Sequence, residues 1–291
     1  MSLPPEILKK VKLLELSVRK KVDNVFTGEY HSAFKGQGMT FSEFREYVPG
    51  DDVRDIAWSL TARTGKPFIK KYDEERETTL FLVVDVSGSV DFGSKQYLKG
   101  EVIIHLAALL AFAAKSNNDP IGLLMFSDQI EHFVPPKKGI GQVHRILRDL
   151  FYIRPRSKKT GIGVACDHIL KAIKKKAHVF IFSDFADHNF ESSIRLLGKK
   201  HDTVAVVVDD SVEKEFPDVG LLEWQDPETG ERICMDTSSA WFRQTYTNGF
   251  LQTKDKIQKT LRSAGIDHIN ISVGDDYVTP FISFFKKRGR K

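Results

Sequence analysis

Three short oxygen-bearing side chains occupy alternate positions in the segment Asp85-Val-Ser87-Gly-Ser89. The segment follows the apolar run 79–84, which has the composition of a strand buried on both faces. Carboxylate and hydroxyl oxygens are the ligands that small divalent cations such as Mg²⁺ take in proteins. Ser89 or Asp91 capping a following helix is the alternative interpretation. The spacing therefore raises two hypotheses, a metal site and a helix cap.

Two further segments carry oxygen atoms that would meet the first. The apolar run 178–182 is followed by Ser183-Asp184, and the loop 157–163 contains Thr160 just before a predicted helix, with Ser157 as a competing hydroxyl. In open α/β sheets, ligands bind outside the carboxyl ends of the strands, where the strand order reverses. We therefore expect one metal site for Mg²⁺ or another divalent cation, with the candidate residues Asp85, Ser87, Ser89, Thr160 and Asp184.

Strands and helices alternate from residue 78 onward, and these elements must position the candidate site. Apolar strands are predicted at 79–84, 121–126, 178–182, 203–208 and 266–273, and helices at 95–115, 141–151, 163–175, 190–199 and 239–264. Residues 130–134 are predicted to pair with 121–126, and 226–230 to form a hairpin turn that leads into a strand at 232–236. The alternation favours an α/β fold with a doubly wound, mostly parallel sheet and helices on both faces.

The first 77 residues have a different pattern. Apolar residues recur at helical spacing from 7 to 25 with a basic opposite face, which is typical of a helix that packs on its own domain, or else of one that contacts a membrane surface or a partner. Residues 28–77 are predicted to be an irregular segment wrapped on the main domain. A short helix is expected at 41–47, with Trp58 and Phe68 as apolar anchors.

Charged residues at two further places have a structural and a functional interpretation. Asp51 and Asp52 are interpreted as turn residues in ion pairs rather than as a catalytic pair. The basic end of the chain, residues 276–291, is interpreted as a solvated tail rather than as a phosphate-binding one. The expected domains are therefore an N-terminal helix and wrapping segment at 1–77, an α/β domain at 78–275 and a basic tail at 276–291.

Composition limits the class of protein. The chain has 291 residues, 41% of them hydrophobic and 29% charged, and a net charge of +5, which permits acidic partners without demanding nucleic acid. Its two cysteines show no metal-binding or redox spacing. The first residues lack the apolar core of a signal peptide, and the longest apolar run, 102–114, is too short to cross a bilayer. These features predict a cytoplasmic protein without a transmembrane segment.

Signals for catalysis are weak. A phosphohydrolase of the haloacid dehalogenase type would need a second carboxylate two residues after Asp85, where Ser87 stands, and the chain has no Gly-rich phosphate-binding motif. Cys166, Asp167 and His168 are neighbours on a predicted helix and would point in different directions. We therefore predict a protein that is not an enzyme and has no catalytic residue, with a magnesium-dependent phosphohydrolase and a nucleic-acid-binding protein as alternatives.

The candidate metal ligands resemble a known site. Asp85-x-Ser87-x-Ser89, Thr160 and Asp184 are similar to the metal-ion-dependent adhesion site of von Willebrand factor A domains. The resemblance implies a sheet of von Willebrand factor A type, in which Ser87, Ser89 and Thr160 contact the cation directly or nearly so. It implies that Asp85 and Asp184 act mainly through water. One coordination position would be left for a Glu or Asp of a partner protein.

Over nearly its whole length, the chain also resembles a bacterial family, domain-of-unknown-function 58. The resemblance lies in Gly36-Gln-Gly38-Met-Thr-Phe41, in 44–58, in 60–63, in 72–77 and in the Asp226-Pro-Glu-Thr-Gly230 segment. Many relatives carry two N-terminal membrane helices, and this chain resembles the short form without them. Such proteins are typically encoded beside a MoxR-type AAA+ ATPase. The resemblance thus implies an adaptor that binds this ATPase and a client protein, through an acidic residue, in the assembly or maturation of a complex.

Overall fold

The computed structural model describes residues 12–15, 27–33, 40–73, 79–93, 97–215, 217–226 and 228–289. The chain forms two compact units. One comprises Met1–Ala33 together with Thr79–Lys291, and the other comprises Phe34–Thr78. The candidate metal ligands all belong to the first unit.

A six-stranded sheet forms the centre of the first unit, in the order β10-β7-β6-β3-β4-β5. Neighbouring strands are parallel except at the edge, where β5 runs antiparallel to β4. All six residues of β3 are buried, as the continuous apolar run predicts. The predicted α/β class and mostly parallel sheet are confirmed. The strands are β3 (Leu80–Asp85), β4 (Ile121–Phe126), β5 (Ile130–Lys137), β6 (His178–Ser183), β7 (Asp202–Asp210) and β10 (Asp267–Val273).

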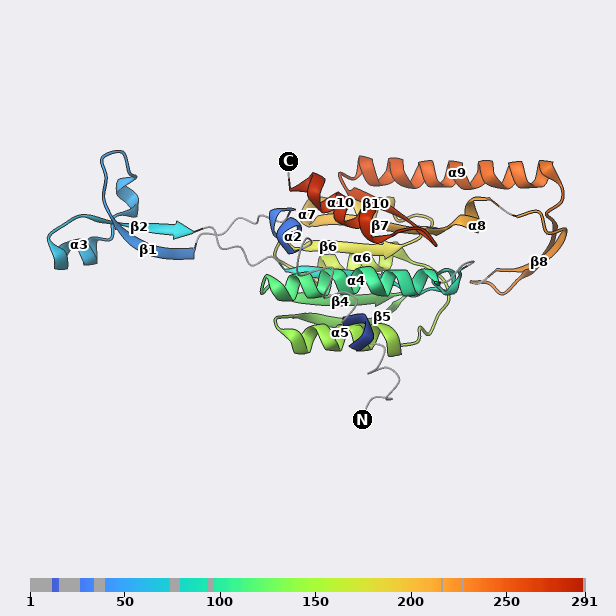
Figure 1. Cartoon of the computed structure of the whole chain (residues 1–291), viewed down its shortest axis with the longest axis horizontal. Helices are drawn as coiled ribbons and strands as arrows, with labels where there is room; N and C mark the ends of the chain where they lie inside the picture. The colour runs from blue at the N-terminus through green and yellow to red at the C-terminus, as the bar shows by residue number, and fades with distance from the viewer. Residues whose placement is uncertain are drawn as a thin grey trace. The chain divides into compact units, whose positions relative to one another are not determined.

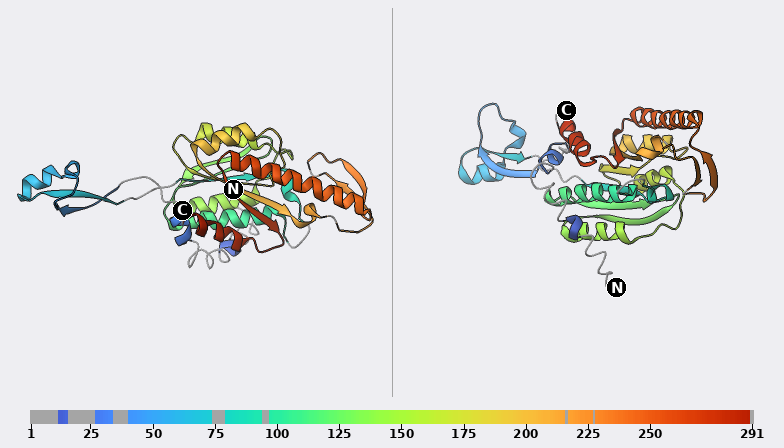
Figure 2. Two further views of the ribbon diagram at one scale, coloured as in Figure 1. Left: turned by 90° about the horizontal axis from the view of Figure 1, so that it is seen from above. Right: turned by 45° about the vertical axis from the view of Figure 1, so that its right-hand side comes forward.

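Helices cover both faces of this sheet (Figure 1). One face packs against α6 (Ile162–Ala172), α7 (Glu191–Lys200) and α9 (Ala240–Ser263), whose buried apolar residues join those of the strands in one core cluster. The other face carries α4 (Lys99–Ser116), α5 (Ile140–Tyr152) and α10 (Val278–Arg288) (Figure 2). Most of α4 is buried, because its sequence is apolar around nearly the whole helix.

The C-terminal helix α10 is packed against the domain. The predicted solvated tail is wrong for α10, where Phe281 and Phe285 are fully buried four residues apart on one helix face. The Phe285 ring stacks on Phe180 of β6 with ring centroids 5.9 Å apart, and it also contacts Tyr30 of α2 (Thr27–Ala33). The basic residues Lys286 and Lys287 lie on the exposed face of the same helix.

The second unit is a small antiparallel arrangement. Strands β1 (Thr40–Glu46) and β2 (Phe68–Asp73) pair, and between them lie the 3₁₀ helix η2 (Val53–Asp55) and the helix α3 (Trp58–Thr64). The predicted helix at 41–47 is therefore wrong, because pairing with β2 supplies backbone hydrogen bonds that local propensity does not reveal. Trp58 is also not an anchor, since 68% of its surface is exposed, while Ala57 and Ile69 are buried.

The adjacent carboxylates of the second unit belong to a turn, as predicted. Asp51 accepts hydrogen bonds from the Val48 N–H at 2.9 Å and from Arg45 at 2.8 Å, and these contacts hold the pKa of Asp51 below its usual value. Asp52 caps η2 by accepting the Arg54 N–H at 2.9 Å. Both side chains are thus occupied by turn contacts. The predicted wrapping of this segment on the main domain stays a prediction.

Most of the predicted N-terminal helix at 7–25 lies outside the described residues, and residues 12–15 are helical. Leu14 in this stretch is 5% exposed. Among the helices that the structure describes, none combines the length and the apolar character needed to cross a membrane.

Candidate metal centre

The loops that carry the candidate residues converge where the strand order reverses. Strands β3 and β6 are neighbours in the middle of the sheet, with Val84 in register with Phe182. Asp85 ends β3 and Ser183 ends β6, and the Ser183 hydroxyl donates a hydrogen bond of 2.6 Å to Asp85 Oδ2. The carboxyl ends of both strands therefore lie at one rim of the sheet, which is where open α/β sheets bind ligands.

The loop after β3 holds its oxygen atoms close together. The Asp85 side chain is fully buried and accepts the Ser87 N–H at 2.9 Å through Oδ1. The hydroxyl oxygens of Ser87 and Ser89 lie 3.1 Å apart. The alternative in which Ser89 or Asp91 caps the next helix is wrong, because α4 begins at Lys99 with residue 98 at the cap position.

Thr160 is brought to the same region by the loop before α6. The Gly88 N–H donates to the Lys158 carbonyl at 2.8 Å, which ties this loop to the loop after β3. The Thr160 hydroxyl donates a 2.6 Å hydrogen bond to Glu228 Oε1. The competing Ser157 hydroxyl instead accepts the Lys159 N–H at 3.3 Å. Of the two hydroxyls that the sequence offers, Thr160 is thus the one that faces a carboxylate.

Asp184 pairs with a buried lysine that sequence reasoning missed. Lys99 Nζ lies 3.2 Å from Asp184 Oδ2 and also forms an ion pair with Glu213 of the short helix α8 (Ser211–Lys214). Lys99 is 1% exposed. Burial lowers the pKa of Lys99, but the charges of Asp184 and Glu213 more than offset it, so the net shift is upward. The ammonium is therefore a fixed internal cation.

Buried negative charge accumulates around Asp184. Burial, then the charge of Asp184, raises the pKa of Asp85 to about 7 against hydrogen bonds from Ser183 and Ser87. Burial also raises the pKa of Glu213 and of Glu228, and in both cases the Asp184 charge adds to the shift. With all four carboxylates ionised, the one positive charge of Lys99 neutralises only part of this cluster, so a further cation would stabilise it.

The donor atoms fit a small hard cation. The described residues contain no group of three or more His, Cys, Asp or Glu side chains arranged to hold a metal ion. A divalent ion at this rim would therefore depend on the hydroxyl oxygens of Ser87, Ser89 and Thr160, with the carboxylates supplying charge. Such an all-oxygen donor set suits Mg²⁺ rather than the nitrogen and sulfur preference of zinc.

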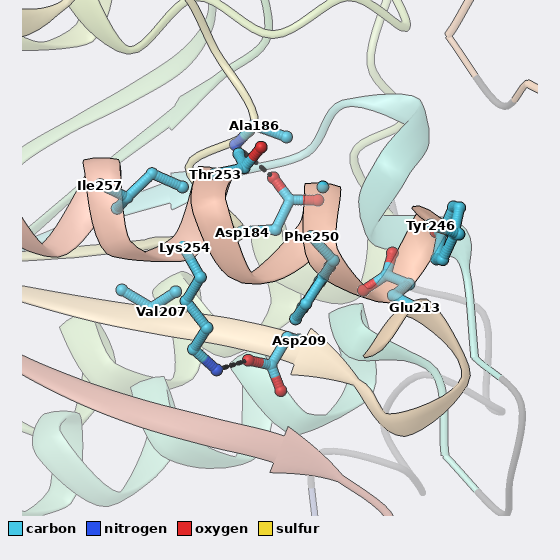
Figure 3. Close-up of a pocket in the computed structure, with 11 residues that line it drawn as sticks. Asp184, Ala186, Val207, Asp209, Glu213, Tyr246, Phe250, Thr253, Lys254 and Ile257 are labelled. Atoms are coloured by element: carbon cyan, nitrogen blue, oxygen red, sulfur yellow. Dashed lines mark hydrogen bonds and ion pairs between the residues drawn. The ribbon is translucent and has the colours of Figure 1, made fainter. Parts of the chain in front are cut away.

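A cavity of about 370 Å³ borders Asp184 on the side of α9 (Figure 3). Phe250, Ile257 and Val207 give it apolar walls. Polar groups at its rim include an ion pair between Lys254 and Asp209. A second cavity of about 310 Å³ borders Asp85 and Ser87, between the end of β3, α4 and the end of α5. The edge of the sheet that carries the candidate ligands thus borders a cavity on each of two sides.

Cys166 and His105 are packing residues. Cys166 is buried in the core of α6, and burial raises the pKa of its thiol to about 12, so it is a poor nucleophile. His105 of α4 is hydrogen-bonded through Nδ1 to the Tyr277 hydroxyl at 2.7 Å, which accounts for a histidine in an apolar helix.

The fold and the rim together define an α/β protein with a candidate oxygen-ligand cation site. Comparison with protein families then identifies the family of the chain. The model of the family described as "Protein of unknown function DUF58" matches residues 43–256, and the chain belongs to this family. The uncharacterized protein Rv1480 of Mycobacterium tuberculosis (strain H37Rv) is 28% identical over 291 residues, which cover 98% of this chain and 91% of that protein. The uncharacterized protein MAV169 of Mycobacterium avium is 24% identical over 160 residues, covering 54% of this chain and 94% of that protein.

Two solved structures align with most of the chain. An aerotolerance-related membrane protein from Bacteroides fragilis aligns with a TM-score of 0.51 at 13% identity, covering 73% of this chain and 98% of that one. The conserved hypothetical protein BatB from Bacteroides thetaiotaomicron aligns with a TM-score of 0.48 at 13% identity, covering 74% and 100%. At 13% identity, the similarity to the Bacteroides fragilis protein is evidence for the fold alone.

Proposed function

We propose that the chain is an adaptor of von Willebrand factor A type, which uses a divalent cation to hold an acidic side chain of a partner protein. The convergence of the loops after β3, before α6 and after β6 at one rim carries this proposal. The sheet order and the antiparallel edge strand support the fold assignment. We assign Ser87, Ser89 and Thr160 to direct contact with the cation, and Asp85 and Asp184 to its charge and water shell.

An interaction role accounts for the chemistry of the rim. A bound Mg²⁺ would supply an open coordination position, and a carboxylate of the partner would fill it. No nucleophile or proton-transferring group is required for such a step. Family membership is consistent with a MoxR-type AAA+ ATPase as the partner, and with an adaptor in the cytoplasm that brings a client protein to this ATPase.

Mg²⁺ is expected to stabilise the protein, and Asp85→Asn is expected to abolish the effect. At an Mg²⁺ concentration of about ten times the dissociation constant, the linkage relation gives a gain of about 1.4 kcal/mol, or roughly 3 °C in Tm. Differential scanning calorimetry with and without Mg²⁺ measures this gain. The variant lacks the buried charge that favours the cation, although its side chain keeps nearly the same shape.

Asp167→Asn is the matched control, because Asp167 is an exposed residue of α6. It should respond to Mg²⁺ as the wild-type protein does. Titration calorimetry that detects no divalent-ion binding to the wild-type protein would contradict the proposed function.

Co-purification of a MoxR-type ATPase with the tagged protein is expected to be lost in the Ser87→Ala/Ser89→Ala variant. The two hydroxyl groups lie 3.1 Å apart, so their loss removes two candidate ligands from one side of the cation. The control is Ser192→Ala/Ser263→Ala, at two exposed positions on α7 and α9. Equal recovery of the ATPase with both variants would place the partner surface elsewhere, for example on residues 36–63.

A magnesium-dependent phosphohydrolase is the second candidate, and the cavity beside Asp184 is the observation that favours it. A bound Mg²⁺ can polarise a phosphoryl group and activate water. Turnover of a generic phosphate monoester that requires Mg²⁺ and disappears in Asp85→Asn would favour this enzyme over the adaptor.

A further inference from the structure

The β8–β9 hairpin presents one glutamate at the candidate metal centre. Strands β8 (Leu221–Gln225) and β9 (Arg232–Asp236) pair antiparallel beyond the carboxyl ends of the central strands (Figure 1). Within the turn, Asp226 Oδ1 accepts the N–H groups of Glu228 and Thr229, both at 2.8 Å. The Gly230 N–H donates to the Asp226 carbonyl, also at 2.8 Å. These bonds fix the turn independently of the Glu228 side chain.

Only part of the hairpin surface is in contact with the domain. The Trp224 ring packs on Phe92, with centroids 5.3 Å apart, and Phe92 directly follows the 3₁₀ helix η3 (Gly88–Asp91) that contains Ser89. Other large side chains of the hairpin are open to solvent, with Leu221 at 77% and Ile233 at 52% exposure. The hairpin is thus attached beside the metal-site loop, while much of its surface remains free.

Glu228 contacts the candidate centre through its carboxylate. Its Oε1 accepts the 2.6 Å hydrogen bond from Thr160, one of the hydroxyls assigned to the cation. The negative charges of Glu228 and Asp184 also repel each other. A carboxylate that is hydrogen-bonded to a candidate metal ligand and repelled by a second carboxylate gains stability from a cation nearby.

We propose that Glu228 is the chain's own acidic ligand of the cation, and that it occupies the position an acidic residue of a partner would otherwise take. This inference rests on the proposed cation site. The hairpin would then be an internal competitor of the partner, which must exchange one carboxylate for another.

The exchange leaves the charge and the number of oxygen ligands at the cation unchanged. Its equilibrium is therefore set by the contacts that hold the hairpin in place, such as the Trp224–Phe92 pair. A partner binds with an apparent affinity reduced by the fraction of molecules in which Glu228 has released the cation. The hairpin would thus lower binding to weak acidic ligands and favour a partner that also engages the hairpin surface.

Mn²⁺ is a suitable probe, because the water-proton relaxation rate per bound ion reports how many exchangeable waters the ion keeps. With Glu228 as a ligand, the wild-type complex keeps fewer waters. Glu228→Ala is expected to raise the relaxivity per bound Mn²⁺ and to weaken Mn²⁺ binding by about tenfold, as loss of a supporting carboxylate commonly does. Glu231→Ala, an exposed position in the same turn, is the matched control and should behave like the wild type.

Acetate tests whether the freed position accepts an external carboxylate. Added acetate should lower the relaxivity of Glu228→Ala toward the wild-type value and leave the wild-type complex unchanged. Hydrogen exchange supplies a second readout, since Mn²⁺ should slow exchange across residues 221–236 in the wild type. Glu228→Gln, which keeps the size of the side chain and an oxygen for Thr160, should lose this protection.

The outcomes separate the two proposals. Wild-type protein that binds no Mn²⁺ would overturn the cation site and this inference together. Mn²⁺ binding with the same affinity and relaxivity in the wild type, Glu228→Ala and Glu228→Gln would leave the cation site standing and overturn the role of Glu228.

Discussion

Replacing Lys99 with methionine is expected to lower the free energy of unfolding by about 3–5 kcal/mol, the usual cost of removing one partner from a buried ion pair. Methionine keeps a long apolar side chain, so the packing of α4 changes little. The carboxylates of Asp184 and Glu213 lose the ammonium that pairs with both. Urea unfolding at about pH 7.5 in a buffer free of divalent ions measures the effect.

Lys259→Met is the matched control, because Lys259 is exposed on α9 and pairs only with its helical neighbour Asp255 among the contacts described. Its expected cost is below about 1 kcal/mol. The Lys99 effect should shrink as the pH falls, since burial raises the pKa of Glu213 and this carboxylate therefore takes up a proton at a higher pH than an ordinary glutamate does. Equal costs for both variants would contradict the role of Lys99 as the internal counter-ion.

The same variant bears on the cation site. If a divalent ion supplies charge next to Asp184, Mg²⁺ should stabilise Lys99→Met more than it stabilises the wild type, whereas Lys259→Met should gain only as much as the wild type gains. Asp184 is the group that joins these effects, because Lys99, Glu213 and Glu228 all interact with it. A substitution of Lys99 or Glu213 should therefore also change the electrostatic environment of Glu228 in the β8–β9 hairpin.

The sequence predicted the central sheet well because its strands carry the strongest local signal. A continuous apolar run such as 79–84 can be buried on both faces, and helices between such runs imply parallel pairing. The position of Asp85 beside the end of β6 then followed from the topology, and the hydrogen bond to Ser183 confirms that these two strand ends meet. Whether an ion binds there stays a prediction.

Lys99 and Glu228 were missed because their partners are distant in the sequence. Lys99 lies 85 residues from Asp184, and Glu228 lies 68 residues from Thr160. Neither contact leaves a periodic pattern. The available signals were a lysine at the start of a long apolar helix and a glutamate within the Asp226-Pro-Glu-Thr-Gly230 segment, and neither indicated a direction toward the rim. The β1 strand was missed for a related reason, since its residues pair with β2 residues that lie 22 (Glu46 to Phe68) to 33 (Thr40 to Asp73) positions later in the chain.

Asp202→Asn is expected to lower the free energy of unfolding by about 2–3 kcal/mol near neutral pH. In acid, the stability of the variant should fall less steeply with pH than that of the wild type. Asp202 begins β7 and lies 2.8 Å from His178 Nδ1, and it also pairs with Arg288 of α10. Burial raises the pKa of Asp202, but the hydrogen bond from His178 and the charge of Arg288 outweigh burial and hold the pKa at about 2. The carboxylate thus ties the C-terminal helix to the sheet.

The direction in which stability changes with pH follows from proton binding to Asp202 in the folded and unfolded states. Between about pH 4 and pH 2, the unfolded chain takes up a proton at this aspartate while the folded protein does not, so stability falls as the pH falls. The contribution is fully present above about pH 4, where both states are ionised. Urea unfolding of the wild type and the variant at about pH 7, 4 and 2.5 should show two curves that differ at neutral pH and converge in acid. Asp255→Asn, at an exposed position of α9, is the control and should follow the wild-type curve. A difference in the free energy of unfolding between the wild type and Asp202→Asn that is the same at all three pH values would rule out the ionised Asp202 as the link between α10 and the sheet.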